Sequence, residues 1–290
     1  MVKCWILNLN VNDVQSITAN HFNYAGDIGA MHFFLLLNTC IEDINNITLE
    51  EINIVHAAIL FKGHLKDKTL AQSYRTISTC PLIAKGLDMF VRDLNLDKWK
   101  EDQSEVQFLG EGSSHELAAL LLTETIQHSL FNLKQPIFVI YLDAKSAFDR
   151  VLRKLLVRNL YHAGTAGQEL LLINHRLNER KTIVEWAGNL MGPIQDQLGL
   201  EQGGVNSGDF YKVFGKSQLQ MAQDSCLGIP LAKNLIISAI GQADDTLHVS
   251  NKIHNIQNLL ELSNSFCCKY NVELCPEKNQ APGICSKETR

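Results

Sequence analysis

The amino-acid sequence predicts an α+β fold whose centre is a ferredoxin-like antiparallel sheet. Two observations indicate this class. From Pro136 onward the predicted elements run strand, helices, strand, strand, helix, strand, which is the order of a split βαβ sheet. Carboxylates also stand at two strand ends, Asp143 after the first strand and Asp244 with Asp245 between the next two. Because the first strand lies beside the central hairpin in this topology, we expect the two acidic motifs to meet.

The chain divides into three regions: an N-terminal extension over residues 1–45 with no assigned role, a mixed region over 46–135, and the sheet region over 136–290. Within 46–135, capping-box spacing and apolar repeats predict helices, and a short run with β-branched residues predicts a strand. The predicted elements are a helix beginning at Thr48 and Glu51 and continuing through Ile52, Val55 and Ile59, a strand over 73–78, a helix over 81–94, and a helix beginning at Ser113 and Glu116 and continuing through Leu122, Ile126 and Leu130.

The region 136–290 has the clearest strand signals. A continuous apolar run with β-branched and aromatic residues, bounded by Pro136 and Asp143, predicts a buried strand over 137–142. The next apolar repeat starts at Val151 and predicts a helix with Gly164 just past its end. The remaining predicted elements are a helix over 169–180, a glycine-rich turn over 199–204, a helix from that turn to about Gln223, strands over 235–240 and 246–249 that form a hairpin, a helix over 253–270, and a short strand over 272–274.

Composition bounds the class of protein. The chain has 290 residues, of which 46% are hydrophobic, and this suffices for one large domain or two smaller ones. Its net charge is −5, whereas free-standing nucleic-acid binders usually carry an excess of Lys and Arg. The eight cysteines include no CxxC pair, so we expect reduced thiols rather than a zinc site or a disulfide framework.

No targeting or membrane segment is expected. The apolar run over 31–37 is too short to span a bilayer, and the N-terminus lacks the layout of a signal peptide. Together with the cysteine usage, this predicts a protein of the nucleus or the cytoplasm that is neither secreted nor bound to a membrane.

The strand-end carboxylates indicate a metal-dependent site. A carboxylate at a strand end is costly to desolvate unless a cation or a hydrogen-bond donor meets it. Two such ends side by side offer oxygen ligands to hard divalent ions. Two ions a few ångströms apart stabilise both the attacking and the leaving oxygen of a nucleotidyl transfer. The ordinary alternatives stay open, with Asp143 as a helix N-cap and Asp244–Asp245 as a hairpin turn.

Six short motifs resemble those of the reverse transcriptase of non-LTR (LINE-type) retrotransposons. Each motif is weak alone, but their order and spacing over about residues 60 to 280 are specific. The matching stretches are 73–78 for the fingers motif, 107–116 for the stretch before the palm, 142–149 for motif A, 201–207 for motif B, 243–245 for motif C, and 270–274 with Lys278 for motif D.

The resemblance implies a right-hand polymerase palm over 136–290 and a fingers subdomain over 46–135. We expect no thumb, because the chain stops soon after motif D. The implied activity is that of an RNA-directed DNA polymerase, which joins a primer 3′-hydroxyl to a dNTP by two-metal nucleotidyl transfer. The implied cofactors are two Mg²⁺ ions, which Mn²⁺ can replace. The implied partners are an RNA template, a DNA primer and dNTPs, and no oligomeric state is implied.

The same resemblance implies roles for individual residues at the palm. Asp143 and Asp244 would be metal ligands, the backbone carbonyl of Ala144 would help to hold one ion, and Asp245 would have a supporting catalytic role. Phe148 would lie beneath the sugar of the incoming nucleotide and exclude a 2′-hydroxyl. The other implied contacts are those of Ala147 with the 3′-hydroxyl, Arg75 and Lys68 with the triphosphate, Gln202 and Gly203 with nucleotide or template, and Lys278 as general acid for pyrophosphate.

An ordinary structural role is the alternative for several of these residues. Phe148 could be a core residue at a helix start, and Gly203 could belong to a plain Gly-Gly loop. The cationic side chains of Arg75, Lys68 and Lys278 could simply be solvated. One residue departs from the family pattern, since Gln242 stands where an aromatic residue is common.

Two other functions compete with this interpretation. An RNA-directed RNA polymerase shares the palm carboxylates, but Phe148 argues against it because that enzyme must admit a 2′-hydroxyl. A catalytically silent, retrotransposon-derived remnant or nucleic-acid-binding module is favoured by the low net basicity and the missing thumb. The presence of Asp143, Asp244, Arg75 and Gln202 opposes it.

Overall fold

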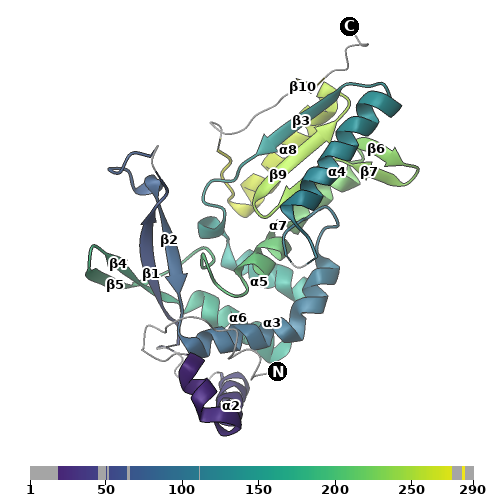
Figure 1. Ribbon diagram of the computed structural model, residues 1–290. Helices are drawn as coiled ribbons and strands as arrows, with labels where there is room; N and C mark the ends of the chain where they lie inside the picture. Colours follow the sequence, from purple (N-terminus) through teal and green to yellow (C-terminus); the bar gives the residue numbers. More distant parts are fainter. Residues whose placement is uncertain are drawn as a thin grey trace. The chain divides into compact units, whose positions relative to one another are not determined.

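The computed structural model describes residues 19–44, 50, 52–63, 66–110, 112–275 and 283–284 (Figure 1). The chain forms two compact units, each assembled from two separate stretches of sequence. Unit 1 comprises Met1–Trp99 and Val157–Ser207, and unit 2 comprises Lys100–Leu156 and Gly208–Arg290. Both units contain helices and sheets, which confirms the predicted α+β class.

Unit 1 contains a four-stranded mixed sheet in the order β2-β1-β4-β5. Its strands are β1 (Ile54–Phe61), β2 (Tyr74–Thr79), β4 (Lys181–Trp186) and β5 (Asn189–Gln195). β1 pairs antiparallel with β2 and parallel with β4, so two distant stretches of sequence share one sheet. The strand predicted over 73–78 is thereby confirmed as β2.

The helices of this part of the chain are α2 (Ala19–Glu42), α3 (Leu82–Asp102), α5 (Arg153–His162) and α6 (Gly167–Asn178), and α3 and α5 each continue into unit 2. α3 presents buried Leu82, Leu87 and Val91, and α6 presents buried Leu172. The indole of Trp99 donates to Thr165 Oγ1 at 2.8 Å. The helices predicted over 81–94, from Val151 and over 169–180 are confirmed, although α3 is longer than predicted.

The helix predicted through Ile52, Val55 and Ile59 is wrong, because these residues belong to or directly precede strand β1. Both edges of β1 are paired, for example His56 with Thr79 of β2 and with Ile183 of β4. Helix propensity is a weak preference that such tertiary pairing overrides. The proposed capping residues Thr48 and Glu51 lie outside the described residues.

The hairpin of β4 and β5 was not predicted. Its sequence signal is the β-branched run over 182–184 followed by the two-residue loop Ala187–Gly188. Both loop residues have positive φ, 50° and 77°, which is the backbone geometry that two-residue hairpins favour.

Unit 2 contains a four-stranded sheet in the order β10-β3-β9-β8, in which every neighbouring pair is antiparallel. Its strands are β3 (Ile137–Leu142), β8 (Ala239–Gln242), β9 (Asp245–Ser250) and β10 (Gly283–Ile284), and β6 (Ile229–Ala232) with β7 (Leu235–Ile237) forms a separate small hairpin. β3 lies beside the β8–β9 hairpin, which confirms the predicted topology.

Three helices pack against this sheet: α4 (His115–Gln127, followed by a π-helical turn over His128–Asn132), α7 (Ser207–Asp224) and α8 (Ile253–Tyr270). One buried hydrophobic cluster joins Val139 of β3 and Ile240 of β8 with Leu219 of α7 and Leu259 of α8. The cluster fixes the sheet and therefore the loops at its ends. The helices predicted over 253–270 and through Leu122 are confirmed.

Three local predictions need correction. The N-cap of α4 is Ser114 rather than Ser113, since the Ser114 hydroxyl accepts from the backbone of Leu117. The strand predicted over 235–240 is broken at Ser238, whose backbone N–H donates to the Gln223 side chain instead of a strand partner. The strand predicted over 272–274 is a single bridge between Leu274 and Ala144.

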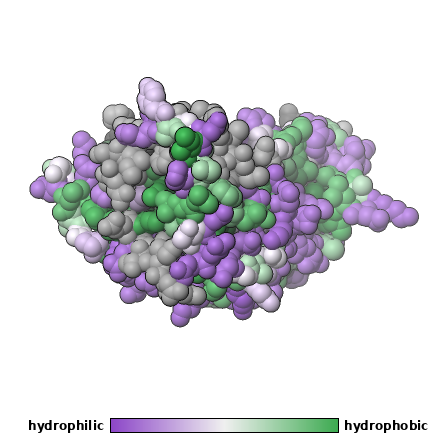
Figure 2. Space-filling model, turned by 90° about the horizontal axis from the view of Figure 1, so that it is seen from below, coloured by the Kyte–Doolittle hydropathy of each residue, from purple (hydrophilic) through white to green (hydrophobic). Residues whose placement is uncertain are grey.

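Large apolar side chains are exposed on α2, among them Tyr24, Ile28, Met31 and Leu35. Figure 2 views the molecule from below, where α2 lies in Figure 1, and shows hydrophobic side chains gathered at the surface. Among the described residues, no helix is both long and apolar enough to cross a membrane.

Candidate active site

Three carboxylates lie at one end of the sheet of unit 2. Leu142, the last residue of β3, pairs with Thr246 of β9, so Asp143 directly follows the last pair. Gln242 of β8 pairs with Asp245 of β9, which leaves a two-residue loop that contains Asp244. The sheet topology therefore brings Asp143, Asp244 and Asp245 to the same edge, and all three are half-buried.

All three carboxylates influence the pKa of the Tyr141 phenol. Its hydroxyl donates a short hydrogen bond to Asp245 Oδ1. Burial raises the pKa of Tyr141 above its ordinary value, and the hydrogen bond to Asp245 and the charges of Asp143 and Asp244 raise it further. Because Coulomb interactions decline with distance, Tyr141 lies near all three carboxylates at this edge.

Ala144 lies at the same edge, directly after Asp143. The 272–275 segment pairs with the chain after β3, where Cys275 N–H donates to Asp143 O at 2.9 Å and Lys145 N–H donates to Glu273 O at 2.7 Å. These bonds flank the bridge between Ala144 and Leu274. Asp143 and Ala144 are thereby fixed directly after the last residue of β3, at this edge of the sheet.

The donor set fits a hard divalent ion. Carboxylate and carbonyl oxygens are its ligands, and Mg²⁺ is usually held by one or two carboxylates together with substrate phosphates rather than by a closed protein cage. Over the described residues, no group of three or more His, Cys, Asp or Glu side chains is arranged to hold a metal ion. The edge that carries Asp143, Ala144 and Asp244 offers oxygen donors of this kind.

The turn that carries Asp244 has an unusual backbone. Ala243 has a φ of 57°, a left-handed conformation that costs a non-glycine residue on the order of 1 kcal/mol. The side chain of Gln107 holds this residue, since its Oε1 accepts from Ala243 N–H at 3.1 Å and its Nε2 donates to Ala243 O at 3.3 Å. The sequence offers no local signal for such a contact between residues far apart in the chain.

Phe148 lies in a one-turn helix (Phe148–Arg150) shortly after β3, next to buried Ala147. Its ring stacks on that of Tyr211 in α7, with ring centres 4.8 Å apart. Burial raises the pKa of Tyr211, and the charge of Asp244 raises it further, so Tyr211 lies near the carboxylate edge. Phe148 is therefore held beside that edge by Tyr211, which the sequence analysis missed.

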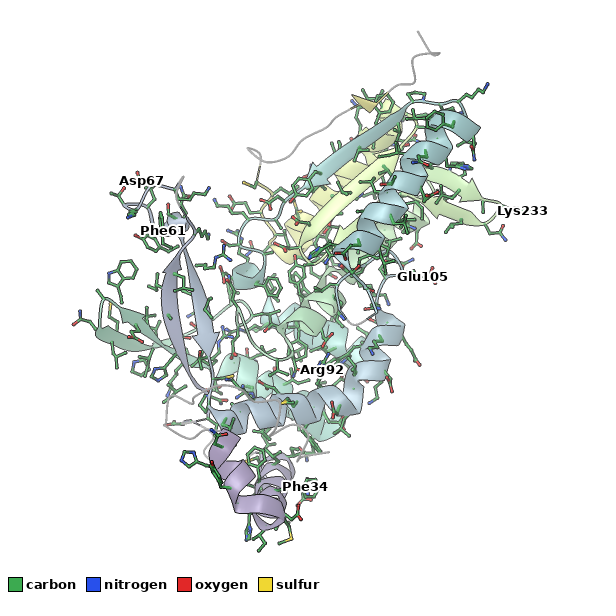
Figure 3. The ribbon with its side chains drawn as sticks, in the orientation of Figure 1. Phe34, Phe61, Asp67, Arg92, Glu105 and Lys233 are labelled. Atoms are coloured by element: carbon green, nitrogen blue, oxygen red, sulfur yellow. The ribbon has the colours of Figure 1, made fainter. Side chains whose placement is uncertain are left out.

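Arg75 and Lys68 belong to unit 1, in or near the β1–β2 hairpin. Arg75 lies in β2 opposite Leu60 of β1, and its side chain is exposed. The ammonium of Lys68 lies 5.6 Å from the centre of the Phe61 ring. Phe61 and Asp67, both labelled in Figure 3, mark the end of the hairpin where this contact occurs.

Gln202 and Gly203 form a loop that is attached to the same sheet of unit 1. The Gln202 carbonyl accepts from the backbone N–H of Ser78 in β2 at 3.0 Å. Gly203 has a φ of 103°, a conformation that favours glycine. Gln202 is half-buried and Gly203 is exposed.

Charged side chains support this loop. Arg180 donates to Asp196 at 2.8 Å and lies 3.6 Å from Glu201, the residue before Gln202. Thr182 also donates to Asp196, at 2.6 Å. Arg180 and Asp196 were not singled out from the sequence, whereas Glu201 opens the motif B stretch over 201–207.

Arg176 and Asp88 form a second ion pair in unit 1. Arg176 donates to both carboxylate oxygens of Asp88, at 2.8 and 3.0 Å. Burial by itself would lower the pKa of Arg176, but the charges of Asp88 and Glu201 more than offset it, so the guanidinium stays charged. The side chain of Asn206, which follows the Gln202 loop, donates to the backbone carbonyl of Asp88 at 2.9 Å.

The predicted site residues thus fall into two groups. Asp143, Ala144, Asp244, Asp245 and the pair Ala147 and Phe148 belong to unit 2, and Arg75, Lys68, Gln202 and Gly203 belong to unit 1. Lys278 lies outside the described residues.

Comparison with known proteins identifies a family. Residues 65–282, well over half of the chain, match the family model described as reverse transcriptase (RNA-dependent DNA polymerase). None of the curated proteins compared with the chain matches it.

Solved telomerase structures share the fold. Apo telomerase of Candida tropicalis, truncated from its C-terminal domain, aligns with a TM-score of 0.60 and 13% identity over 90% of this chain and 56% of that one. Candida tropicalis telomerase in complex with a TWJ fragment of telomeric RNA has a TM-score of 0.60 and 12% identity, over 88% of this chain and 45% of that one. The corresponding complex from Candida albicans has a TM-score of 0.55 and 13% identity, over 83% and 43%. The chain spans about half the length of these structures.

Proposed function

We propose that this chain, which belongs to the reverse transcriptase (RNA-dependent DNA polymerase) family, adds deoxynucleotides to a DNA primer along an RNA template. The observation that carries the proposal is the placement of Asp143, Asp244 and Asp245 at one edge of the unit 2 sheet. Carboxylates gathered at one edge without a closed cage suit a reaction in which substrate phosphates bring further ligands.

Reverse transcriptase domains use divalent metal ions, and we assign two Mg²⁺ to this edge, with Mn²⁺ as a substitute. Asp143, Asp244 and the Ala144 carbonyl would hold them. When bound, two such ions stabilise the charge on the attacking and leaving oxygens of an in-line displacement. The part of the chain itself is to hold the carboxylate and carbonyl oxygens at this edge. Tyr141 contributes through its hydrogen bond to Asp245.

The sugar of the incoming nucleotide would meet Phe148. Its ring is backed by Tyr211 at 4.8 Å and cannot withdraw without breaking that stack. A fixed ring beneath the sugar would exclude a 2′-hydroxyl by steric overlap, while the small Ala147 side chain leaves space for the 3′-hydroxyl. This arrangement favours deoxynucleotides and argues against an RNA-directed RNA polymerase.

The residues of unit 1 supply the remaining contacts in this proposal. Arg75 and Lys68 would bind the triphosphate. The guanidinium of Arg75 can form bidentate hydrogen bonds with phosphate oxygens. Gln202 and Gly203 would contact nucleotide or template through a loop whose backbone can approach a ligand closely. Lys278 would give a proton to the departing pyrophosphate.

We further propose that the chain derives from a non-LTR (LINE-type) retrotransposon. The support is the order and spacing of its six motifs, from the fingers stretch over 73–78 to the stretch over 270–274. The telomerase structures share the fold at 12–13% identity, which carries no argument for a telomeric role.

Primer extension tests the polymerase assignment. The full chain is given an RNA template with an annealed DNA primer and either dNTPs or NTPs, with and without Mg²⁺. We expect extension with dNTPs only, dependent on the ion, and lost in Asp143→Asn. No extension by the wild-type chain, or equal extension by Asp143→Asn, contradicts the proposal.

The same assay tests sugar selection. Phe148→Val should raise incorporation of ribonucleotides relative to deoxyribonucleotides, because it removes the ring from beneath the sugar. Phe138→Val, a change in β3 within the hydrophobic cluster, is the control for general loss of packing. An unchanged ratio in an active Phe148→Val variant would rule out a steric role for this ring.

A further inference from the structure

We propose that Gln107 is a positioning residue whose side-chain amide fixes the turn that presents Asp244 and Asp245. The inference deepens the proposed polymerase function and rests on it. Gln107 lies just after Glu105, which Figure 3 labels, in the segment that leads from α3 to α4. Its side chain is 6% exposed. A buried amide needs partners, and here both are supplied by one residue of the turn.

The amide of Gln107 bonds both backbone groups of Ala243. Its oxygen accepts from the Ala243 N–H at 3.1 Å, and its nitrogen donates to the Ala243 carbonyl at 3.3 Å. The two groups of Ala243 are a donor and an acceptor, so they define which end of the amide is oxygen. A side-chain amide is the neutral group that satisfies both at once.

The backbone of Gln107 is itself anchored to the sheet. Gly241 N–H donates to the carbonyl of Val106, and Phe108 N–H donates to the carbonyl of Gly241, each at 2.8 Å. Gln107 thus sits in a parallel bridge with Gly241, two residues before Ala243. These two backbone hydrogen bonds restrict the position of the Gln107 side-chain amide. The amide therefore restrains the turn instead of moving together with it.

Residue Gly241 makes room for this arrangement. A Cβ atom at Gly241 would lie 3.2 Å from Gln107 Nε2 and 2.7 Å from Leu219 Cδ1. The absence of a side chain at Gly241 therefore allows the amide to lie along β8 and reach Ala243. The Gln107–Gly241 bridge, the missing side chain of Gly241 and the Gln107 amide therefore depend on one another.

The hydrogen bonds from Gln107 to Ala243 affect Asp244 and Asp245 through the backbone that joins them. Ala243 has a left-handed φ of 57°, which its own side chain disfavours, and Asp244 and Asp245 follow it directly. The two-residue hairpin loop requires this conformation, and without Gln107 it loses the two hydrogen bonds that hold it, so the carboxylates after it are less firmly fixed in direction. Because ion affinity depends on the direction of ligands fixed by such supporting contacts, the ion should bind less tightly.

The chain offers a matched control at the other end of the same strand. Gln223 also uses its side-chain amide to hold backbone groups, since its oxygen accepts from Ser238 N–H at 2.7 Å and Ala239 N–H at 3.1 Å. Its nitrogen donates to the Ile236 carbonyl at 3.1 Å. Gln223 therefore performs the same backbone contact at the start of β8, whereas Gln107 acts at its carboxylate end.

The experiment measures Mn²⁺ affinity of the full chain by electron paramagnetic resonance, for the wild type, Gln107→Met and Gln223→Met. Methionine keeps the length of the side chain and removes both hydrogen bonds. We expect Gln107→Met to weaken Mn²⁺ binding about tenfold or more, in the range found for contacts that support metal ligands, and Gln223→Met to leave it within twofold. Equal affinity in the wild type and Gln107→Met overturns the proposal, and so does an equal loss in both variants.

A second variant covers the case in which Gln107→Met does not fold. Gln107→Asn keeps the amide but shortens it by one methylene, so it cannot reach both groups of Ala243 and should weaken Mn²⁺ binding in the same direction. Hydrogen exchange of the Ala243 amide should become faster in this variant, while that of Ala239 stays unchanged. Unchanged exchange at Ala243 overturns the proposal. Neither readout requires primer extension, so failure of the polymerase assignment is detected separately.

Discussion

The loop that carries Gln202 and the turn that carries Asp244 are held by different chemistry. In unit 1, the Gln202 loop is surrounded by ion pairs, with Arg180 between Asp196 and Glu201 and with Arg176 on Asp88. In unit 2, Gln107 holds the Asp244 turn through a neutral amide, and Tyr141 contacts Asp245 through a neutral hydroxyl.

The difference agrees with the roles proposed for the two segments. A carboxylate that holds a cation must keep its negative charge available, and a Lys or Arg placed to orient it would compete with the ion. Neutral donors orient such a group without adding a positive charge. The Gln202 loop has no such restriction, because a glutamine and a glycine carry no charge, so ion pairs can stabilise it.

The largest expected effect is the loss of a partner in the buried ion pair of unit 1. Arg176→Met leaves Asp88 buried without its guanidinium, and we expect a loss of about 3–5 kcal/mol in the free energy of unfolding. Urea denaturation measures it. The double variant Arg176→Met, Asp88→Leu should recover most of the loss, because it removes both charges. A loss below about 1 kcal/mol in the single variant would show that this pair behaves like a surface pair.

The next effect in size is a sensitivity of unit 2 to acid, through a buried histidine. His248 of β9 is fully buried with its Nε2 2.6 Å from Ser263 Oγ, and burial lowers its pKa to about 4. Above pH 6.5 the ring is neutral in both folded and unfolded chains. As the pH falls below 6.5 the unfolded chain gains a proton first, so stability should fall by about 1.4 kcal/mol per pH unit, about 3 kcal/mol in total near pH 4.

The pH dependence of urea denaturation between pH 7 and 4.5 tests this expectation. His248→Gln should reduce the slope of stability against pH, because glutamine does not titrate. His254→Gln, at an exposed position of α8, is the control and should keep the slope. An equal slope for the wild type and His248→Gln would assign the acid sensitivity to other groups.

A smaller effect is expected when the Tyr141 hydroxyl, which donates to Asp245, is removed. Tyr141→Phe removes one hydrogen bond and keeps the ring, so the fold should be retained and the rate of primer extension should drop about 10- to 100-fold, as for other supporting contacts at metal sites. Single-turnover extension at saturating dNTP measures it. Tyr161→Phe, which changes an exposed tyrosine, should have no effect. Full activity of Tyr141→Phe would mean that Asp245 is oriented by other contacts.

The smallest expected effect concerns Gln242, the residue before the turn. Its side-chain oxygen is buried and has no hydrogen-bond partner among the described residues. An unsatisfied buried polar atom costs about 1–3 kcal/mol, so Gln242→Met should stabilise the chain by about 1 kcal/mol. Thermal or urea denaturation would show it. A destabilised variant would indicate that the oxygen has a partner, such as a bound water.

The sequence identified elements whose signals were local. The apolar run between Pro136 and Asp143 coincides with β3, and the predicted helix over 253–270 coincides with α8. The spacing of Ile52, Val55 and Ile59 fits a helix, yet the same residues are β-branched, and pairing with two distant strands decided the outcome. Local pattern could not reveal those partners.

The same limit applies to the site. Asp143 and Asp244 were found because each stands at the end of a strand, which is a local property. Gln107 and Tyr211 act through side-chain contacts across the chain, with Gln107 separated from Ala243 by 136 residues. No spacing rule connects such residues, and only the folded sheet shows which backbone or ring they meet.

The hydrogen bond from Ser78 to the Gln202 carbonyl has a mechanical consequence. Ser78 belongs to the strand that carries Arg75, so strand and loop are joined directly rather than only through the core of unit 1. Any movement of β2 would therefore move the Gln202 loop as well. The proposed triphosphate contact of Arg75 and the proposed nucleotide or template contact of Gln202 would move together. A displacement of the strand that carries Arg75 would therefore also displace Gln202.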